Sequence, residues 1–107
     1  MNIAQESFPY APADWDITIA EETAKTDGLN LNHDHLELIR ALQEYYGKVE
    51  FPKLRQVKDA LEEKFHSRGG MKYLYQIVPG GPVAEGCRLA GLHVPAGAVD
   101  KSFGSTA

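Results

Sequence analysis

The chain has 107 residues, of which 43% are hydrophobic and 24% are charged, and its net charge is −4. This length predicts one domain with a single modest core. No apolar run approaches the roughly 18 residues of a membrane-spanning helix, and the N-terminus lacks the basic start and apolar stretch of a secretory signal. A single cysteine excludes an internal disulfide and predicts a reducing, cytoplasmic location.

The charge is unevenly distributed along the chain. Between Lys53 and Lys72, six basic residues stand against three acidic ones, a balance of +3, whereas the remainder carries five basic and twelve acidic residues, a balance of −7. A basic strip on an acidic body favours an acidic partner or a phosphate, and it is equally consistent with a solvated helix face.

Residues 1–11 show no apolar period and are predicted to form an N-terminal arm. Asp14 is the candidate N-cap of a first helix from Trp15 to about Lys25. The dipeptide Asp27-Gly28 is expected to end this helix, because Gly28 suits the left-handed position that follows a helix.

A second helix is predicted from its cap at Asn32 to about Tyr46, with Gly47 as its end. Its apolar stripe has helical spacing and consists of Leu38, Ile39, Leu42, Tyr45 and Tyr46.

Pro52 is expected in the first turn of a third helix, whose stripe is Leu54, Val57, Leu61 and Phe65. Gly69-Gly70 separates it from a short fourth helix with the stripe Met71, Leu74, Tyr75 and Val78.

After a turn at Pro79-Gly80-Gly81, Pro82 opens a fifth helix and Gly91 closes it. No segment alternates between apolar and polar residues, so the sequence predicts an all-α domain of about five short helices over residues 12–91. Residues 92–107 are small and poor in apolar side chains, and they are predicted to form a flexible C-terminal arm.

Cys87 is the one residue with evident redox chemistry, and its surroundings can be interpreted in two ways. It shares a helical face with Val83 and Ala90, which is the pattern of an inert core residue. A functional thiol would instead be exposed, and Arg88 or Arg55 would lower its pKa by favouring the thiolate.

Several blocks of the sequence occur together in a characteristic order and spacing. They are Asp14-Trp15, His35, Tyr45-Tyr46, Pro52 with Arg55, Lys72-Tyr73-Leu74-Tyr75, Pro79 with Gly81-Pro82, and Cys87-Arg88-Leu89-Ala90-Gly91-Leu92. In this arrangement the chain resembles the DsrC/TusE/DsvC family of sulfur-relay proteins, from Trp15 almost to its end.

The resemblance implies a small helical protein whose C-terminal arm carries sulfur between sulfurtransferase or sulfite-reductase-type partners. One branch of the family serves dissimilatory sulfite reductase, and another serves tRNA thiolation. The main carrier cysteine of typical members corresponds to Ala98 here, and Cys87 matches a second cysteine eleven residues earlier. Because an alanine cannot hold sulfane sulfur, Cys87 is the only possible persulfide acceptor, by thiolate attack on a sulfane sulfur.

The resemblance also places Arg55 near the groove in which the arm docks. We therefore expect a binding surface that uses Arg55, Lys53, Arg88 and Lys72 to attract a thiolate, a persulfide or an acidic partner. The alternative for Arg55 is a surface ion pair with Asp59.

A different class of function is consistent with the second and third helices, which resemble a helix-turn-helix pair. Lys53, Arg55 and Lys58 lie at the start of the third helix, where such motifs contact nucleic acid. A regulatory protein that binds nucleic acid or a protein partner through this region is therefore the alternative hypothesis. The histidines lack metal-ligand spacing, so neither a metal site nor a cofactor is predicted.

Overall fold

A computed structural model of the chain describes residues 8–98. Over this range it contains five α-helices and one short 3-10 helix and no strand, which confirms the all-α prediction. The elements are α1 (Ile17–Thr26), α2 (His33–Lys48), α3 (Leu54–Lys64), η2 (His66–Arg68), α4 (Gly70–Ile77) and α5 (Pro82–Ala90).

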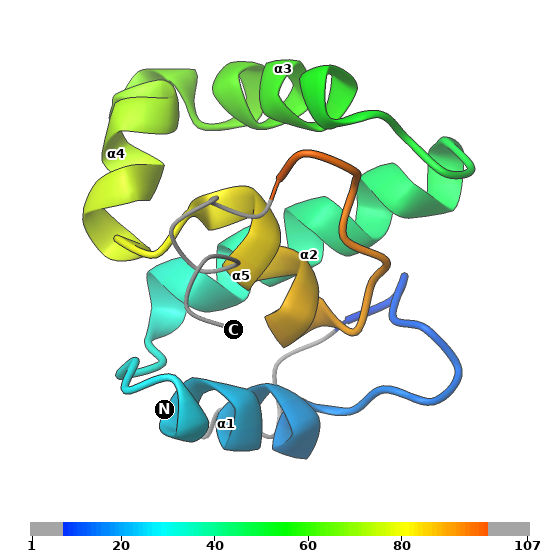
Figure 1. Cartoon of the computed structure of the whole chain (residues 1–107), viewed down its shortest axis with the longest axis vertical. Coiled ribbons are helices and arrows are strands. Elements are labelled where there is room, and N and C mark those ends of the chain that lie inside the picture. Colours follow the sequence, from blue (N-terminus) through cyan, green and yellow to red (C-terminus); the bar gives the residue numbers. More distant parts are fainter. Residues whose placement is uncertain (1–7, 99–107) are drawn as a thin grey trace.

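Helix α5 lies at the centre of the fold, between α1 on one side and α3 with α4 on the other (Figure 1). The longest helix, α2, packs directly against α5 and also against α3. Helix α5 contacts α1, α2, α3 and α4, and most of its residues are buried.

Buried side chains form two clusters, and α2 and α5 contribute to both. The Cys87 cluster contains Leu38, Leu42, Val57, Leu61, Phe65, Leu74, Val78, Val83 and Cys87. The Trp15 cluster contains Trp15, Ala20, Ala24, Leu36, Ile39, Leu89 and Ala90. The α2–α5 pair is therefore the shared wall between two apolar regions.

Two glycines, one within α5 and one directly after it, lie at close contacts with neighbouring side chains. A Cβ atom at Gly86 would lie 2.6 Å from Cδ1 of Leu42, so a larger residue would require the Leu42 side chain or the helices to shift. Gly91 ends α5 in the left-handed conformation (φ +74°), and a Cβ there would lie 2.6 Å from the Trp15 ring. The position of Gly91 confirms the predicted end of the fifth helix.

The start of α2 is fixed by a reciprocal cap and by a long-range contact. Asn32 accepts hydrogen bonds from the N–H groups of Asp34 and His35, and the Asn32 N–H donates to Nδ1 of His35 at 3.0 Å. With Nδ1 as an acceptor, Nε2 carries the proton and donates to the carbonyl of Ile77 at 2.7 Å. The buried His35 ring therefore ties the start of α2 to the end of α4.

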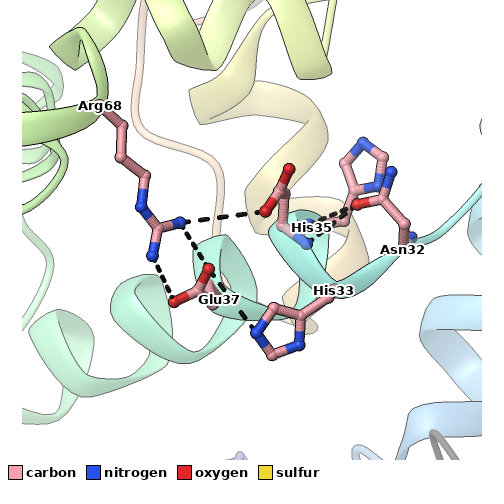
Figure 2. Close-up of polar contacts among 6 residues, drawn as sticks. Asn32, His33, His35, Glu37 and Arg68 are labelled. Atoms are coloured by element: carbon pink, nitrogen blue, oxygen red, sulfur yellow. Dashed lines mark hydrogen bonds and ion pairs between the residues drawn. The ribbon is translucent and has the colours of Figure 1, made fainter. Parts of the chain in front are cut away.

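A charged contact holds η2 against the solvent side of α2. Figure 2 shows the Arg68 guanidinium facing the carboxylate of Glu37, with His33 on the other side of that carboxylate. Arg68 donates to both Glu37 oxygens, at 2.8 Å for the Nη2–Oε2 pair. The hydrogen bond and charge of Arg68 lower the pKa of Glu37, which keeps this carboxyl ionised.

The predicted boundary of the first helix is wrong by two residues. Asp16, not Asp14, is the N-cap, and its carboxylate accepts from the N–H of Ile19 at 3.2 Å. Trp15 lies outside the helix because its indole is buried and donates to the carbonyl of Leu89 at 2.7 Å. This tertiary contact fixes the chain before the helix begins.

Three other local predictions need correction. Gly47 does not end α2, which continues to Lys48 because the N–H of Val49 still donates to the Tyr45 carbonyl. Pro52 precedes the N-cap, since the N–H of Lys53 is satisfied by the Gln56 side chain and α3 begins one residue later. Tyr75, predicted in the α4 stripe, is 48% exposed.

Both predicted arms extend beyond the described residues. Residues 1–7 and 99–107 lie outside them. Phe8 packs on Trp15 with ring centroids 5.0 Å apart, so the end of the predicted N-terminal arm belongs to the Trp15 cluster. Residues 92–98, which we call the arm segment, leave α5, rise past α2 toward α3 and turn back (Figure 1). That the C-terminal arm is flexible stays a prediction.

Candidate functional site

The Cys87 thiol is fully buried, with no exposed surface. Its position on α5 faces the Cys87 cluster, as the spacing with Val83 predicts. Burial raises the pKa of the thiol to about 11, against a smaller opposing effect of a hydrogen bond with Tyr46. At pH 7 about one molecule in ten thousand then carries a thiolate, so the resting thiol is a poor nucleophile.

This result corrects the expectation that an arginine activates Cys87. The Arg88 guanidinium lies 3.0 Å from the carboxylate of Asp27 and 3.5 Å from that of Glu85, and it is occupied there. Arg55 is exposed on α3. The pKa of Cys87 is instead determined by burial and, to a smaller extent, by the hydrogen bond with Tyr46.

One polar side chain contacts the buried sulfur. The Tyr46 hydroxyl lies 3.4 Å from Sγ of Cys87 and donates a hydrogen bond to the carbonyl of His93 at 2.7 Å. Burial and the contact with Cys87 raise the pKa of the Tyr46 hydroxyl well above its usual range. Tyr46 therefore joins the thiol to the arm segment.

The arm segment packs over the same region. Leu92, Val94 and Ala98 lie against the Cys87 cluster, and Pro95 is buried. The N–H of Leu92 donates to the carbonyl of Cys87 at 2.8 Å, which directs the chain back over the helix. The arm segment thus covers part of the Cys87 cluster.

Ala98, the position that corresponds to the carrier cysteine in the resemblance, lies in a cavity of about 210 Å³. Lys58 and Tyr75 form part of its wall, and Gly97 and Ala98 belong to the lining. The beginning of α5, at Gly81 and Val83, completes the cavity. The arm segment therefore ends between α3 and α5.

A second, larger groove lies where α3 begins. It has a volume of about 560 Å³ and is lined by Phe51, Pro52, Lys53, Leu54, Arg55, His93, Pro95 and Ala96. We call it the Phe51 groove, because the Phe51 side chain is 76% exposed at its rim. It unites Lys53 and Arg55, two of the predicted binding residues, with the arm segment.

The other two predicted binding residues are not part of this lining. Lys72 is exposed on α4. Arg88 lines a separate cavity of about 370 Å³ together with Asp27 and Glu85. The basic residues that were grouped by charge alone therefore belong to different surfaces.

Sequence reasoning missed the roles of two residues that define the site. Tyr46 was expected only as a member of the α2 stripe, and its link to His93 spans 47 positions. Phe51 has a left-handed backbone (φ +50°), which no local pattern predicts for a phenylalanine.

Within residues 8–98, no group of three or more His, Cys, Asp or Glu side chains could hold a metal ion.

Comparison with known proteins identifies the family. The model of DsrC-like proteins matches residues 1–99. The chain belongs to the DsrC family. Among DsrC-family relatives, the sulfurtransferase TusE of Escherichia coli K12 is 30% identical over 84% of each chain, and that of Salmonella typhimurium is 31% identical over the same shares. The DsrC protein of Allochromatium vinosum matches in structure with a TM-score of 0.66 and 39% identity, over 80% of this chain and 79% of that one.

Membership in the DsrC family confirms the resemblance and favours a sulfur-relay role over the nucleic-acid hypothesis. Among residues 8–98, no helix is long and apolar enough to cross a membrane.

Proposed function

We propose that this DsrC-family protein binds a protein partner of sulfur relay through the Phe51 groove, in a reducing cytoplasm. The observation that carries the proposal is Phe51 itself. Its large aromatic side chain is 76% exposed, and its backbone is left-handed, a conformation that costs a non-glycine residue roughly 1–2 kcal/mol. A strained backbone that presents an aromatic ring to solvent is typical of a binding site.

The surroundings of Phe51 favour a partner of defined chemistry. The His93 ring stands edge-on to it, with centroids 6.4 Å apart and an interplanar angle of 85°. Lys53 and Arg55 line the same groove, and Lys58 follows one turn later on α3. Aromatic and arginine side chains are the residues that most often anchor interfaces. The expected partner therefore offers an apolar socket surrounded by acidic residues.

Binding to purified sulfurtransferases and sulfite-reductase-type proteins from the same cells, measured by calorimetry, tests this proposal. Phe51→Ala and Arg55→Glu should each weaken binding to the cognate partner at least about tenfold. Matched controls are Tyr10→Ala, which removes another exposed aromatic ring, and Lys25→Glu, which reverses an exposed charge on α1. Equal effects of the groove variants and the controls would contradict the proposed surface.

We further propose that Cys87 accepts sulfane sulfur when the arm segment is displaced. The support is that Cys87 is the only thiol in the chain and lies beneath a segment without helical structure. After treatment with a persulfide donor and partner, the intact mass should increase by one sulfur atom, and Cys87→Ala should abolish the increase. An unchanged mass at every dose would leave a protein that binds partners without carrying sulfur.

A further inference from the structure

The Tyr46 hydroxyl has one proton and two neighbours that compete for it. The carbonyl oxygen of His93, at 2.7 Å, can only accept a hydrogen bond. The Cys87 sulfur, at 3.4 Å, can donate as a thiol or accept as a thiolate. While the arm segment is in place, the tyrosine proton is committed to His93, and the hydroxyl oxygen can only accept from the Cys87 S–H.

We propose that Tyr46 is a positioning residue that makes the reactivity of Cys87 depend on the arm segment. With the arm segment docked, Tyr46 donates to His93 and is not free to donate to the sulfur, which is buried. With the arm segment displaced, the His93 carbonyl leaves, and the same hydroxyl turns to donate to the sulfur. This inference rests on the proposed function, because it assigns the state in which Cys87 accepts sulfur.

The proton balance of the step is simple. In the docked state the hydrogen bonds run from Cys87 to Tyr46 and from Tyr46 to His93. When the arm segment leaves, water enters, the thiol gives its proton to solvent, and the Tyr46 O–H donates to the resulting thiolate. A donated hydrogen bond favours the charged form of the group that accepts it, so the pKa of the thiol falls.

Among the described residues around the sulfur, no charged side chain produces this effect in place of the Tyr46 hydroxyl. The remaining buried members of the Cys87 cluster are apolar, and Tyr45 and Tyr73 pack at its edge. On α5 itself, Arg88 is held by Asp27 and Glu85. The arm segment contributes His93 through its main-chain carbonyl, and Lys58 on α3 lines the separate cavity that contains Ala98.

Alkylation of Cys87 by iodoacetamide across a pH series tests the inference on the full chain. Tyr46→Phe should speed alkylation severalfold, because it removes the hydrogen bond that holds the arm segment. Val94→Asn places an amide on the packed side of the arm segment and should also speed alkylation, whereas Ala96→Asn, at an exposed position, should not.

The decisive variant combines the two changes. In the Val94→Asn background, Tyr46→Phe should slow alkylation about tenfold at neutral pH and move its pH midpoint upward by about one unit, because the thiolate loses its donor. The effect of Tyr46→Phe thus reverses sign between the two backgrounds, which a merely structural tyrosine would not produce.

Faster alkylation in both backgrounds, or an unchanged pH midpoint in the Val94→Asn background, would overturn the inference. So would an inert thiol in Val94→Asn throughout the pH series, since the arm segment would then not control access. Circular dichroism confirms that each variant keeps its helices. Because the assay uses neither a partner nor a sulfur donor, its failure is distinguishable from failure of the proposed function.

Discussion

The two apolar clusters on either side of the α2–α5 pair are closed in different ways. In the Trp15 cluster, the indole N–H donates to the carbonyl of buried Leu89. The Trp15 ring covers this cluster, and Phe8 packs on the ring. In the Cys87 cluster, the Tyr46 hydroxyl donates to an exposed residue of a non-helical segment. The first closure depends on a large buried aromatic surface, and the second depends on the Tyr46 hydrogen bond and on the packing of a short non-helical segment. Opening is therefore expected at the Cys87 side.

Of the changes that test this comparison, removal of the Trp15 side chain should lower the free energy of unfolding the most. Trp15→Ala should lower the free energy of unfolding by about 3–5 kcal/mol, as measured by urea denaturation, because it leaves a large cavity and an unsatisfied Leu89 carbonyl. Trp15→Phe keeps a ring and loses only the donor, so its loss should be nearer 1 kcal/mol. Equal losses for the two variants would show that the hydrogen bond, and not the buried surface, closes this side.

A side chain at the shared wall should affect both clusters. Gly86→Ala should destabilise the fold by about 1–3 kcal/mol, because its Cβ would overlap the Leu42 side chain in the packed core. Gly80→Ala is the matched control, since a Cβ there meets nothing within 4 Å, and its thermal midpoint should stay near that of the unmodified chain. A stable Gly86→Ala variant would mean that Leu42 can move aside.

Loss of the Tyr46 hydroxyl should have a smaller effect on stability than loss of Trp15. Tyr46→Phe should lower the free energy of unfolding by about 1 kcal/mol in a urea titration, the usual net contribution of one hydrogen bond. Tyr10→Phe, at an exposed tyrosine, should leave it unchanged. A loss as large as that of Trp15→Ala would contradict the weaker closure of the Cys87 side.

The smallest effect concerns pH and the contact of α1 with α5. Burial and then the neighbouring Asp27 raise the pKa of Glu85 to about 7, whereas Asp27 has a lowered pKa, mainly through its hydrogen bond with Glu85. Since folded Glu85 binds its proton more tightly than unfolded Glu85, its contribution is complete below about pH 4.5 and is lost as the pH rises through about 7.

Glu85→Gln should therefore have the same free energy of unfolding as the unmodified chain near pH 5. Above pH 8 its free energy of unfolding should be higher, by about 1 kcal/mol at most after solvent screening. Glu21→Gln, which removes the same charge from an exposed site of α1, should show no such dependence on pH. A constant difference across the pH range would show that Glu85 is ionised in the fold throughout.

Local signals in the sequence predicted much of the fold. The Asn32 cap, Pro82 at the start of α5 and the left-handed Gly91 all lie where the patterns placed them, because each depends on a few neighbouring residues. The Asp14 cap was wrong because a contact with Leu89, 74 positions away, withdraws Trp15 from the helix.

The candidate site was less predictable for the same reason. The spacing of Cys87 with Val83 predicted a core residue, and the structure confirms this position. Charge in the sequence could not show that Arg88 is occupied by Asp27, because that pair forms only when α1 meets α5. The contacts of Tyr46 likewise join α2 to residues more than 40 positions later.

Three side chains fasten the chain where α5 ends: Trp15 donates to the Leu89 carbonyl, Gln43 to that of Ala90 and Tyr46 to that of His93. If only the Tyr46 hydrogen bond breaks, the arm segment is free to move beyond Leu92. The six residues 93–98 at full extension then let Ala98 lie up to roughly 20 Å from Leu92. A partner surface that contacts Ala98 away from its docked position must lie inside that radius, so these three hydrogen bonds limit how far the displaced arm segment can reach.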